Sequence, residues 1–346
     1  MVVTTMHRGF YDGLYWLSQD WISLPSRIQD VLWVTQGVYY PILAIAGVPM
    51  NIVTLVILSR KKCGLSKCVT SYLVAMAATD LMIIIVDLIL RHMPMVYHIH
   101  FIFLYSVPVC NIHAVLLYAV TDCSVWFTVT FTFDRFLAIC CQKLKSKYCS
   151  EKTAAVVLGT VSVLSCLKNT FWYFMLTAHY WLMNRPWFCR VTNDVRESRF
   201  WVIIEFLHHI LTPALPFVLI LLLNVFTVRH ILVTSRARGR LIGQSARDPE
   251  MESRRKSIIL LFVISANFIL LWSMIMVYSI WNRMLYLRYL SVWINDFVQE
   301  LAFMLQLLSC CTNTVIYAVT QTKFREQLKS VLKYPFTSIR QCIPSF

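Results

Sequence analysis

Seven long apolar runs constrain this chain more than any other feature of its sequence. Each is about as long as the roughly 20 residues that a helix needs to cross the hydrocarbon core of a bilayer. An open strand would leave backbone groups unpaired in lipid, and barrel strands alternate over about 10 residues, so the runs predict helices. The runs lie near residues 34–58, 69–90, 108–141, 153–176, 200–228, 257–281 and 291–319.

The composition agrees with a membrane protein and excludes other classes. Of the 346 residues, 58% are hydrophobic and only 14% are charged, whereas a soluble domain has roughly 25% charged residues. The net charge of +15 comes from short segments between the apolar runs, and no separate basic domain suggests a nucleic-acid partner. The sequence has no zinc-protease motif, phosphate-binding glycine loop or serine elbow, so we expect that it is not an enzyme.

The distribution of Lys and Arg predicts the orientation in the membrane. The segments after runs one, three, five and seven hold 21 of these residues, and the opposite side holds nine. The richer side is expected to be cytoplasmic. We therefore expect a multi-pass plasma-membrane protein with an extracellular segment over residues 1–33, a seven-helix domain over 34–320 and a cytoplasmic tail over 321–346.

A short amphipathic pattern follows the seventh run. Phe324, Leu328, Val331 and Leu332 fall at helical spacing, with basic residues on the other face. The pattern predicts a helix on the inner leaflet, and the alternative is a solvated basic tail. The expected fold is therefore all-α, a seven-transmembrane helix bundle with a short amphipathic cytoplasmic helix after helix seven.

Several polar side chains lie at mid-membrane depth. Asp80 is in the middle of the second run, with Asn51, Ser124 and Asn313 at comparable depth. A carboxylate in lipid is costly unless it is paired or hydrated, so Asp80 should face the bundle interior. Asp80, Ser124 and Asn313 are candidate ligands of an allosteric Na⁺, and no other cofactor is expected. The alternative is a hydrogen-bond network that only holds helices together.

Two residue pairs lie near the predicted membrane surfaces. Asp134 and Arg135 are adjacent near the cytoplasmic end of the third run. There the aspartate can hold or release the arginine as a switch, unless the two residues only anchor a helix end. Cys110 opens the third run on the outer side, and Cys189 lies in the loop before the fifth. The oxidising exterior permits a disulfide between them.

Taken together, these residues resemble the motifs of the rhodopsin-like (class A) G-protein-coupled receptors over about residues 34–335. The matching positions, in family order and spacing, are Gly47 and Asn51; Leu73, Ala77 and Asp80; Cys110 and Asp134-Arg135-Phe136; Pro216 and Asn224; Leu271-Trp272; Asn313 and Tyr317; and Phe324-Arg325. The resemblance implies a Cys110–Cys189 disulfide. It also implies an activation switch made of Asp134, Arg135, Phe136, Asn224, Trp272, Asn313 and Tyr317.

The sequence departs from the family pattern in several places, and it also lacks the tryptophan expected in the middle of helix four. Phe136 replaces the usual tyrosine, and Met274 and Thr314 replace the usual prolines of helices six and seven. Because a missing proline removes a backbone break, we expect these two helices to be straighter than is usual in the family.

A narrower resemblance is to the orphan peptide-receptor branch whose members respond to aromatic amino acids. That branch likewise lacks the helix-seven proline, and Trp126 and His208 look similar. The carboxylate that anchors amines in the family is absent near Leu117, and helix seven has no lysine for a retinal Schiff base. An aromatic amino acid or short peptide is therefore the expected extracellular ligand.

The expected ligand pocket opens between the outer halves of the helices. Each candidate has an alternative, purely structural role, and of the adjacent His208 and His209 at most one is expected to point inward. The candidates are Asp87, Arg91, His113, Tyr118, Thr121, Asp122, Glu205, His208, His209, Trp272, Gln299, Glu300 and Phe303.

The expected function is a cell-surface receptor that converts binding of this ligand into activation of a heterotrimeric G protein. The partners are then the ligand, the G protein and the lipid bilayer, with no nucleic acid. One alternative is a non-signalling receptor-like scaffold or decoy, which the missing prolines favour. Another is a seven-helix transporter or channel. Against this alternative, the inner half of the bundle is expected to be closed by Phe131, Phe133 and Phe262.

Overall fold

The computed structural model describes residues 24–61, 63–97, 107–175, 198–239, 249–292, 294 and 296–331. Within these residues, seven helical segments are long and apolar enough to cross a membrane, which confirms the predicted spans. No strand occurs in the described part of the chain. The segments are α2 (Leu24–Ser59); α3 (Lys67–Ile83), η1 (Ile84–His92) and α4 (Met93–Tyr97); α5 (Val107–Cys140); α7 (Glu151–Asn169) and α8 (Trp172–Met175); α10 (Arg199–His209), η3 (Ile210–Ala214) and α11 (Leu215–Gly239); α12 (Pro249–Tyr286); and α13 (Asp296–Thr320).

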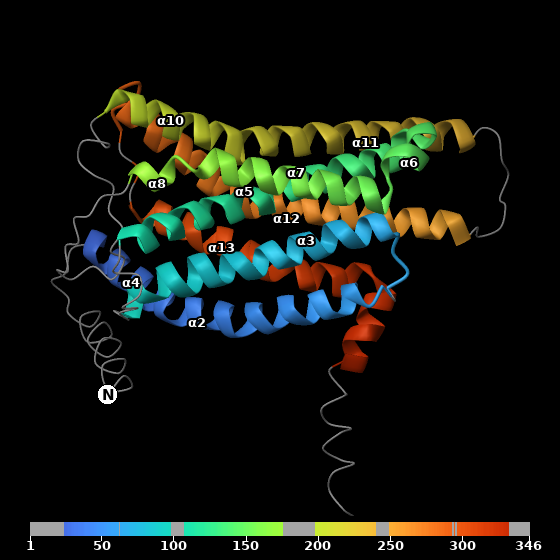
Figure 1. Cartoon of the computed structure of the whole chain (residues 1–346), viewed down its shortest axis with the longest axis horizontal. Helices are drawn as coiled ribbons and strands as arrows, with labels where there is room; N and C mark the ends of the chain where they lie inside the picture. Colours follow the sequence, from blue (N-terminus) through green and yellow to red (C-terminus); the bar gives the residue numbers. More distant parts are fainter. Residues whose placement is uncertain are drawn as a thin grey trace, which may run out of the picture.

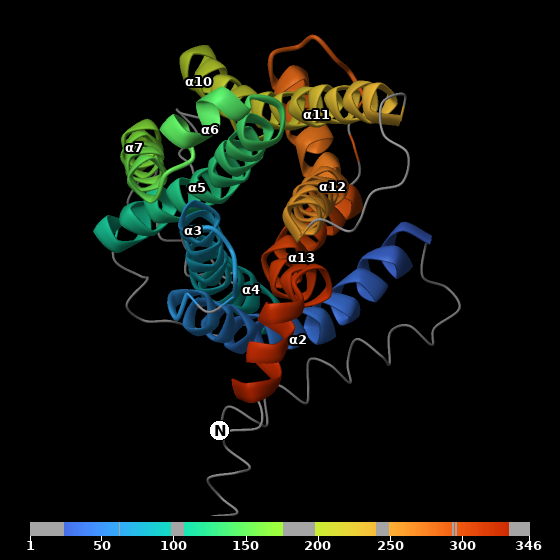
Figure 2. The same cartoon turned by 90° about the vertical axis from the view of Figure 1, so that its right-hand side faces the viewer.

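The helices run side by side along one axis (Figure 1). We call the two ends of the bundle the Leu24 end and the Ser59 end, after the first and last residues of α2. Figure 2 shows a closed ring, in which α13 returns to contact α2, and α5 contacts α3, α7 and α11. The short α6 (Gln142–Tyr148) follows α5 at the Ser59 end.

Apolar side chains cover the outside of the bundle as well as filling its core. Large apolar side chains face outward, and Ile45 and Leu270 are 75% and 70% exposed. The carboxylates Asp80 and Asp122 are buried, each only 1% exposed. This distribution is favourable where the surroundings are lipid, because polar groups then find their partners inside the bundle.

A helix over residues 322–331 follows α13 and turns away from the bundle axis at the Ser59 end (Figure 1). Phe324 is fully buried against Tyr317, with ring centroids 5.9 Å apart, and Leu328 and Val331 pack against the same core. Lys323 and Arg325 are exposed. The predicted amphipathic helix is therefore present, although Leu332 lies outside the described residues.

Several element boundaries differ from the sequence prediction. The first helix begins at Leu24, so part of the segment predicted to precede the bundle is helical. The last span begins at Asp296 rather than near 291. The break in the fifth span lies at Thr212, whose backbone is extended (φ −153°, ψ 113°), and Pro216 follows in the first turn of α11. The residue before a proline avoids the helical region, so Pro213 accounts for this position.

Helices six and seven have no interruption at the positions that lack proline. The helix α12 continues through Met274, and α13 continues through Thr314. The Thr314 hydroxyl lies 2.9 Å from that of Thr54 on α2. The residue that replaces proline therefore contributes a hydrogen bond between helices seven and one.

Close packing joins α2 to its two neighbours. A Cβ at Gly47 would lie 2.6 Å from Cys311 Sγ and 2.7 Å from Ile84 Cδ1, so only glycine allows this approach. One turn further, Asn51 Nδ2 donates to the carbonyls of Gly47 and Cys310, each at 2.9 Å. The helix-one motif therefore holds α2 against α13.

Candidate functional site

A cavity of about 210 Å³ opens between η1, α5, α10, η3, α12 and α13, toward the Leu24 end of the bundle. Both π-helical segments contribute to its wall, as such segments often do at functional sites. Most of the predicted ligand-binding residues meet here. They are Asp87, Arg91, Tyr118, Thr121, Asp122, His208, His209, Trp272, Gln299 and Phe303.

Three predicted residues do not line this cavity. His113 faces η1, where its Nε2 lies 2.8 Å from the Val86 carbonyl oxygen. It is five positions from Tyr118, so the two point about 140° apart around the helix. Glu300 accepts a 2.7 Å hydrogen bond from Gln36 on α2, and Glu205 reaches the cavity only through its ion pair with Arg283.

The two adjacent histidines depart from the expectation that at most one would point inward. Both His208 and His209 line the cavity. They are the last two residues of α10, and the π-helical η3 follows directly. Adjacent residues of an α-helix point about 100° apart, so both can reach a cavity that the end of α10 faces.

The charged groups of the cavity are arranged as ion pairs. Arg91 Nη1 lies 3.1 Å from Asp87 Oδ1, and its guanidinium lies 5.2 Å from the Phe303 ring centroid. On the other side, Arg283 of α12 pairs with Glu205 of α10. The wall therefore offers both signs of charge beside an aromatic face.

Aromatic rings continue from the cavity into the core. Tyr118 stacks on Trp172 with ring centroids 3.9 Å apart, and His208 stands edge-on to both rings. At the inner side, Trp272 stacks on Phe268 and donates through Nε1 to Ser309 Oγ at 3.1 Å. A cavity residue of α12 is thereby bonded to α13.

The structure brings the three predicted cation ligands together. Asp80 Oδ2 accepts a 2.6 Å hydrogen bond from Asn313 Nδ2, and Asp80 Oδ1 accepts one from Ser124 Oγ at 3.3 Å. Asn51 belongs to a different contact, with Cys310. The buried carboxylate and the Ser124 hydroxyl are oxygen donors of the kind that Na⁺ prefers, whereas the Asn313 amide presents its nitrogen to Asp80 here.

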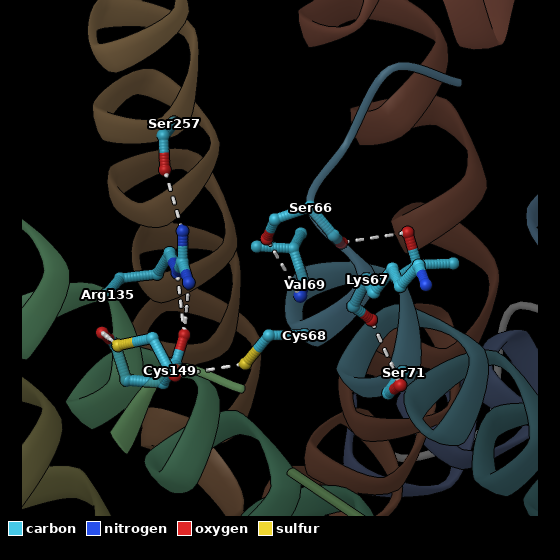
Figure 3. A network of polar contacts seen from close by, with 10 residues as sticks. Ser66, Lys67, Cys68, Val69, Ser71, Arg135, Cys149 and Ser257 are labelled. Atoms are coloured by element: carbon cyan, nitrogen blue, oxygen red, sulfur yellow. Dashed lines mark hydrogen bonds and ion pairs between the residues drawn. The ribbon is translucent and has the colours of Figure 1, made fainter. Parts of the chain in front are cut away.

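Arg135 is held at the Ser59 end by two helices. Its Nε donates to the neighbouring Asp134 Oδ2 at 3.0 Å, and its Nη1 donates to Ser257 Oγ of α12 at 3.3 Å. Figure 3 shows the guanidinium reaching toward Ser257. The structure thus joins helices three and six through the arginine of the predicted switch, beside the half-buried Phe136.

Two cysteines complete the surroundings of Asp134. Cys68 Sγ donates to Asp134 Oδ1 at 3.2 Å, and Cys149 Sγ lies 3.6 Å from the Asp134 carbonyl oxygen (Figure 3). Burial, and then the nearby Asp134 charge, raise the pKa of the Cys149 thiol to about 11. This thiol therefore remains protonated and can donate at neutral pH.

The other two predicted switch residues do not meet each other here. Asn224 Nδ2 donates to the Ile220 carbonyl one turn back on its own helix. Among the described residues, neither Asn224 Oδ1 nor the Tyr317 hydroxyl has a hydrogen-bond partner.

Two of the phenylalanines expected to close the inner half of the bundle differ in position. Phe131 is fully buried against Tyr72. Phe133 is 49% exposed on the outside, so its expected place inside the bundle is wrong.

Sequence reasoning missed important polar residues around the cavity. Lys168 of α7 pairs with Asp122, at 2.6 Å, and Arg283 contributes a second guanidinium to the wall. The signal for Lys168 was a lysine inside the fourth apolar run, because an ionisable residue within the membrane is by default a candidate for function.

The predicted disulfide is only partly described. Cys110 is disulfide-bonded, but Cys189 lies outside the described residues, so the pairing of these two cysteines stays a prediction. Cys110 packs with Ala114 and Trp172, near the aromatic residues of the cavity.

A comparison with known families identifies the class of protein. The family model described as the seven-transmembrane receptors of the rhodopsin family matches residues 50–317. This match covers most of the chain, including the cavity residues and the arginine contact. The chain therefore belongs to the rhodopsin family of seven-transmembrane receptors, and it is a membrane receptor rather than an enzyme.

Proposed function

We propose that this receptor couples an extracellular ligand in the cavity to a heterotrimeric G protein at the Ser59 end. One observation carries the proposal, namely that α12 takes part in both sites. Trp272 of α12 lines the cavity, and Ser257 of the same helix accepts a hydrogen bond from Arg135. The two residues are 15 positions apart, or about 22 Å along the helix.

The proposed mechanism is a population shift between two arrangements of α12. The ligand must bind more tightly to the state in which α12 has moved away from α5. That movement breaks the Arg135–Ser257 hydrogen bond and exposes the guanidinium to the C-terminal helix of the G protein. Asn224 Oδ1 and the Tyr317 hydroxyl, which have no hydrogen-bond partner among the described residues, are then available to stabilise the open state.

The orientation follows from the basic residues. The Ser59 end carries exposed Arg229, Arg255, Lys323 and Arg325. Basic residues favour the cytoplasmic face, where they contact acidic lipid and the G protein. We therefore place this end inside the cell, which puts the N-terminus outside and the cavity within reach of extracellular ligands.

The cavity wall supports an aromatic amino acid or a short peptide as the ligand. Such a ligand has an ammonium and a carboxylate, which Asp87 and the two arginines complement. The ring fits against Tyr118, Trp272 and Phe303. This assignment agrees with the resemblance to the branch that responds to aromatic amino acids.

A cell assay tests the coupling. Cells expressing the chain are exposed to tryptophan, phenylalanine and a short-peptide panel, and dissociation of each main Gα class is measured. We expect a response above that of mock-transfected cells in at least one class. Silence in every class, with surface expression confirmed and binding measured, would contradict coupling and favour the non-signalling scaffold.

We further propose Na⁺ as an allosteric ligand of Asp80, Ser124 and Asn313. The cation would stabilise the state in which α3, α5 and α13 converge on it. Purified receptor in NaCl should therefore have a thermal midpoint roughly 2–4 °C above that in choline chloride. Asp80→Asn should abolish the difference, whereas an equal salt effect in Asp80→Asn and wild type would contradict the site.

A further inference from the structure

Asp122 and Lys168 form a buried polar cluster at one wall of the cavity. Lys168 Nζ lies 2.6 Å from Asp122 Oδ2, and Asn169 Nδ2 donates to the same oxygen at 2.5 Å. Lys168 also donates to Thr212 Oγ1 at 3.1 Å. The cluster joins α5, α7 and η3, and its carboxylate lines the cavity.

One oxygen of this carboxylate lacks a hydrogen-bond partner in the described part of the chain. Asp122 is 1% exposed, and its Oδ1 has no hydrogen-bond partner among the described residues. The neighbouring His208 is 6% exposed and lines the same wall, and its Nδ1 likewise has no partner in the described part of the chain. Leaving a buried acceptor unsatisfied is costly, so a ligand that supplies a donor gains affinity here.

The charges indicate which kind of donor fits. Lys168 already neutralises Asp122, so the pair has no net charge to attract a cation. A ligand ammonium at Oδ1 would also lie close to the Lys168 ammonium and be repelled by it. A neutral N–H or O–H group meets the free oxygen without this repulsion.

The surroundings indicate that the donor belongs to a ring. Tyr118 lies one helical turn from Asp122 on α5, and Trp272 and Ile275 also line the cavity. Aromatic side chains beside a few well-placed polar groups are typical of a pocket that orients a flat ring. Arg91 and Arg283, each in an ion pair, line other walls of the cavity, where the charged end of the ligand would lie.

We propose that the Asp122–Lys168 pair forms a subsite that binds the neutral hydrogen-bond donor of an aromatic ring, such as an indole N–H or a phenol O–H. This inference rests on the proposed ligand-binding role of the cavity and specifies what one wall recognises. It assigns Asp122 Oδ1 as the acceptor and Lys168 as the residue that positions the carboxylate and neutralises it.

Binding to purified receptor in lipid nanodiscs tests the subsite without relying on signalling. The probes are indole, 1-methylindole and 2-methylindole, with tryptophan and 1-methyltryptophan as larger probes. The 2-methyl compound has the same added volume as the 1-methyl compound but keeps its N–H. We expect the N–H probes to bind roughly tenfold more tightly than their N-methyl counterparts.

The variant for this test is the double substitution Asp122→Leu with Lys168→Met. Replacing both members of a buried pair leaves no uncompensated charge. The preference for N–H over N-methyl probes should fall to about one in this variant, provided it binds the 1-methyl probes as wild type does. The matched control is Lys61→Met with Glu151→Leu, which removes an exposed pair 2.7 Å apart and should keep the preference.

Several outcomes would overturn the subsite. These are equal affinity for indole and 1-methylindole in wild type, an unchanged preference in the double variant, or no binding of any N–H probe. Tighter binding of benzylamine than of indole, lost in the double variant, would show that the site takes a cation instead. Preferential binding of N–H probes without G-protein dissociation would support the subsite and contradict coupling. G-protein dissociation without a preference for N–H probes would support coupling and contradict the subsite.

Discussion

Arg135→Ala is expected to lose G-protein activation while ligand binding survives. Arg135 is 7% exposed and bonded to Asp134 and Ser257, and in the open state it would contact the G protein. Truncating one member of a buried hydrogen-bonded contact that includes a charge costs about 2–5 kcal/mol. Loss of the contact between the guanidinium and the G protein should therefore slow nucleotide exchange roughly 30-fold or more. The cavity lies toward the other end of the bundle, so binding should change little.

The controls for this variant separate loss of contact from loss of folding. Arg199→Ala removes an exposed guanidinium at the opposite end of the bundle and should retain exchange. Arg135→Lys keeps the charge without the planar fork and should give an intermediate rate. Normal exchange in Arg135→Ala, at wild-type surface expression, would exclude the proposed role.

Lys168→Met alone is expected to destabilise the receptor strongly. The substitution removes the cationic partner of the buried Asp122 carboxylate and leaves it with neutral donors such as Asn169. Breaking a buried pair by removing one partner costs about 3–5 kcal/mol, whereas replacing both partners by apolar residues is often neutral. The thermal midpoint of purified receptor should therefore drop in the single variant and recover when Asp122→Leu is added.

An exposed ion pair supplies the comparison. Lys61 lies 2.7 Å from Glu151, almost the distance in the buried pair, but its side chain is 55% exposed. Exposed pairs contribute about 0–1 kcal/mol, so Lys61→Met should change the midpoint little. Equal effects of Lys61→Met and Lys168→Met would show that burial of the Asp122–Lys168 pair has no energetic importance.

The fold was predictable because lipid imposes simple requirements on a chain. Length and hydropathy were sufficient to predict the seven spans. The spacing of Phe324, Leu328 and Val331 was sufficient to predict the amphipathic helix. The mid-membrane depth of Asp80 predicted its burial, and the structure supplies Ser124 and Asn313 as its partners. In each case the cost of a polar group in lipid, or of an apolar face in water, selects one arrangement.

Other features depended on local geometry that periodicity does not encode. The sequence could not show that both His208 and His209 would line the cavity, because this depends on how the end of α10 is placed against it. The direction of His113 depends on how α5 is rotated against η1. Predicting the pairing between Asp122 and Lys168 requires knowing the relative depth of two helices in the membrane. Hydropathy alone fixes that depth only to within a turn or more.

The central claim is that ligand binding in the cavity weakens the hold of α12 on Arg135 and exposes it to a G protein. Nucleotide exchange by a purified heterotrimer, with purified receptor in lipid nanodiscs and a ligand already shown to bind, tests this most directly. We predict that saturating ligand accelerates exchange in wild type and leaves it unchanged in Arg135→Ala. Saturated binding with no acceleration in wild type, for every Gα class, would contradict the account.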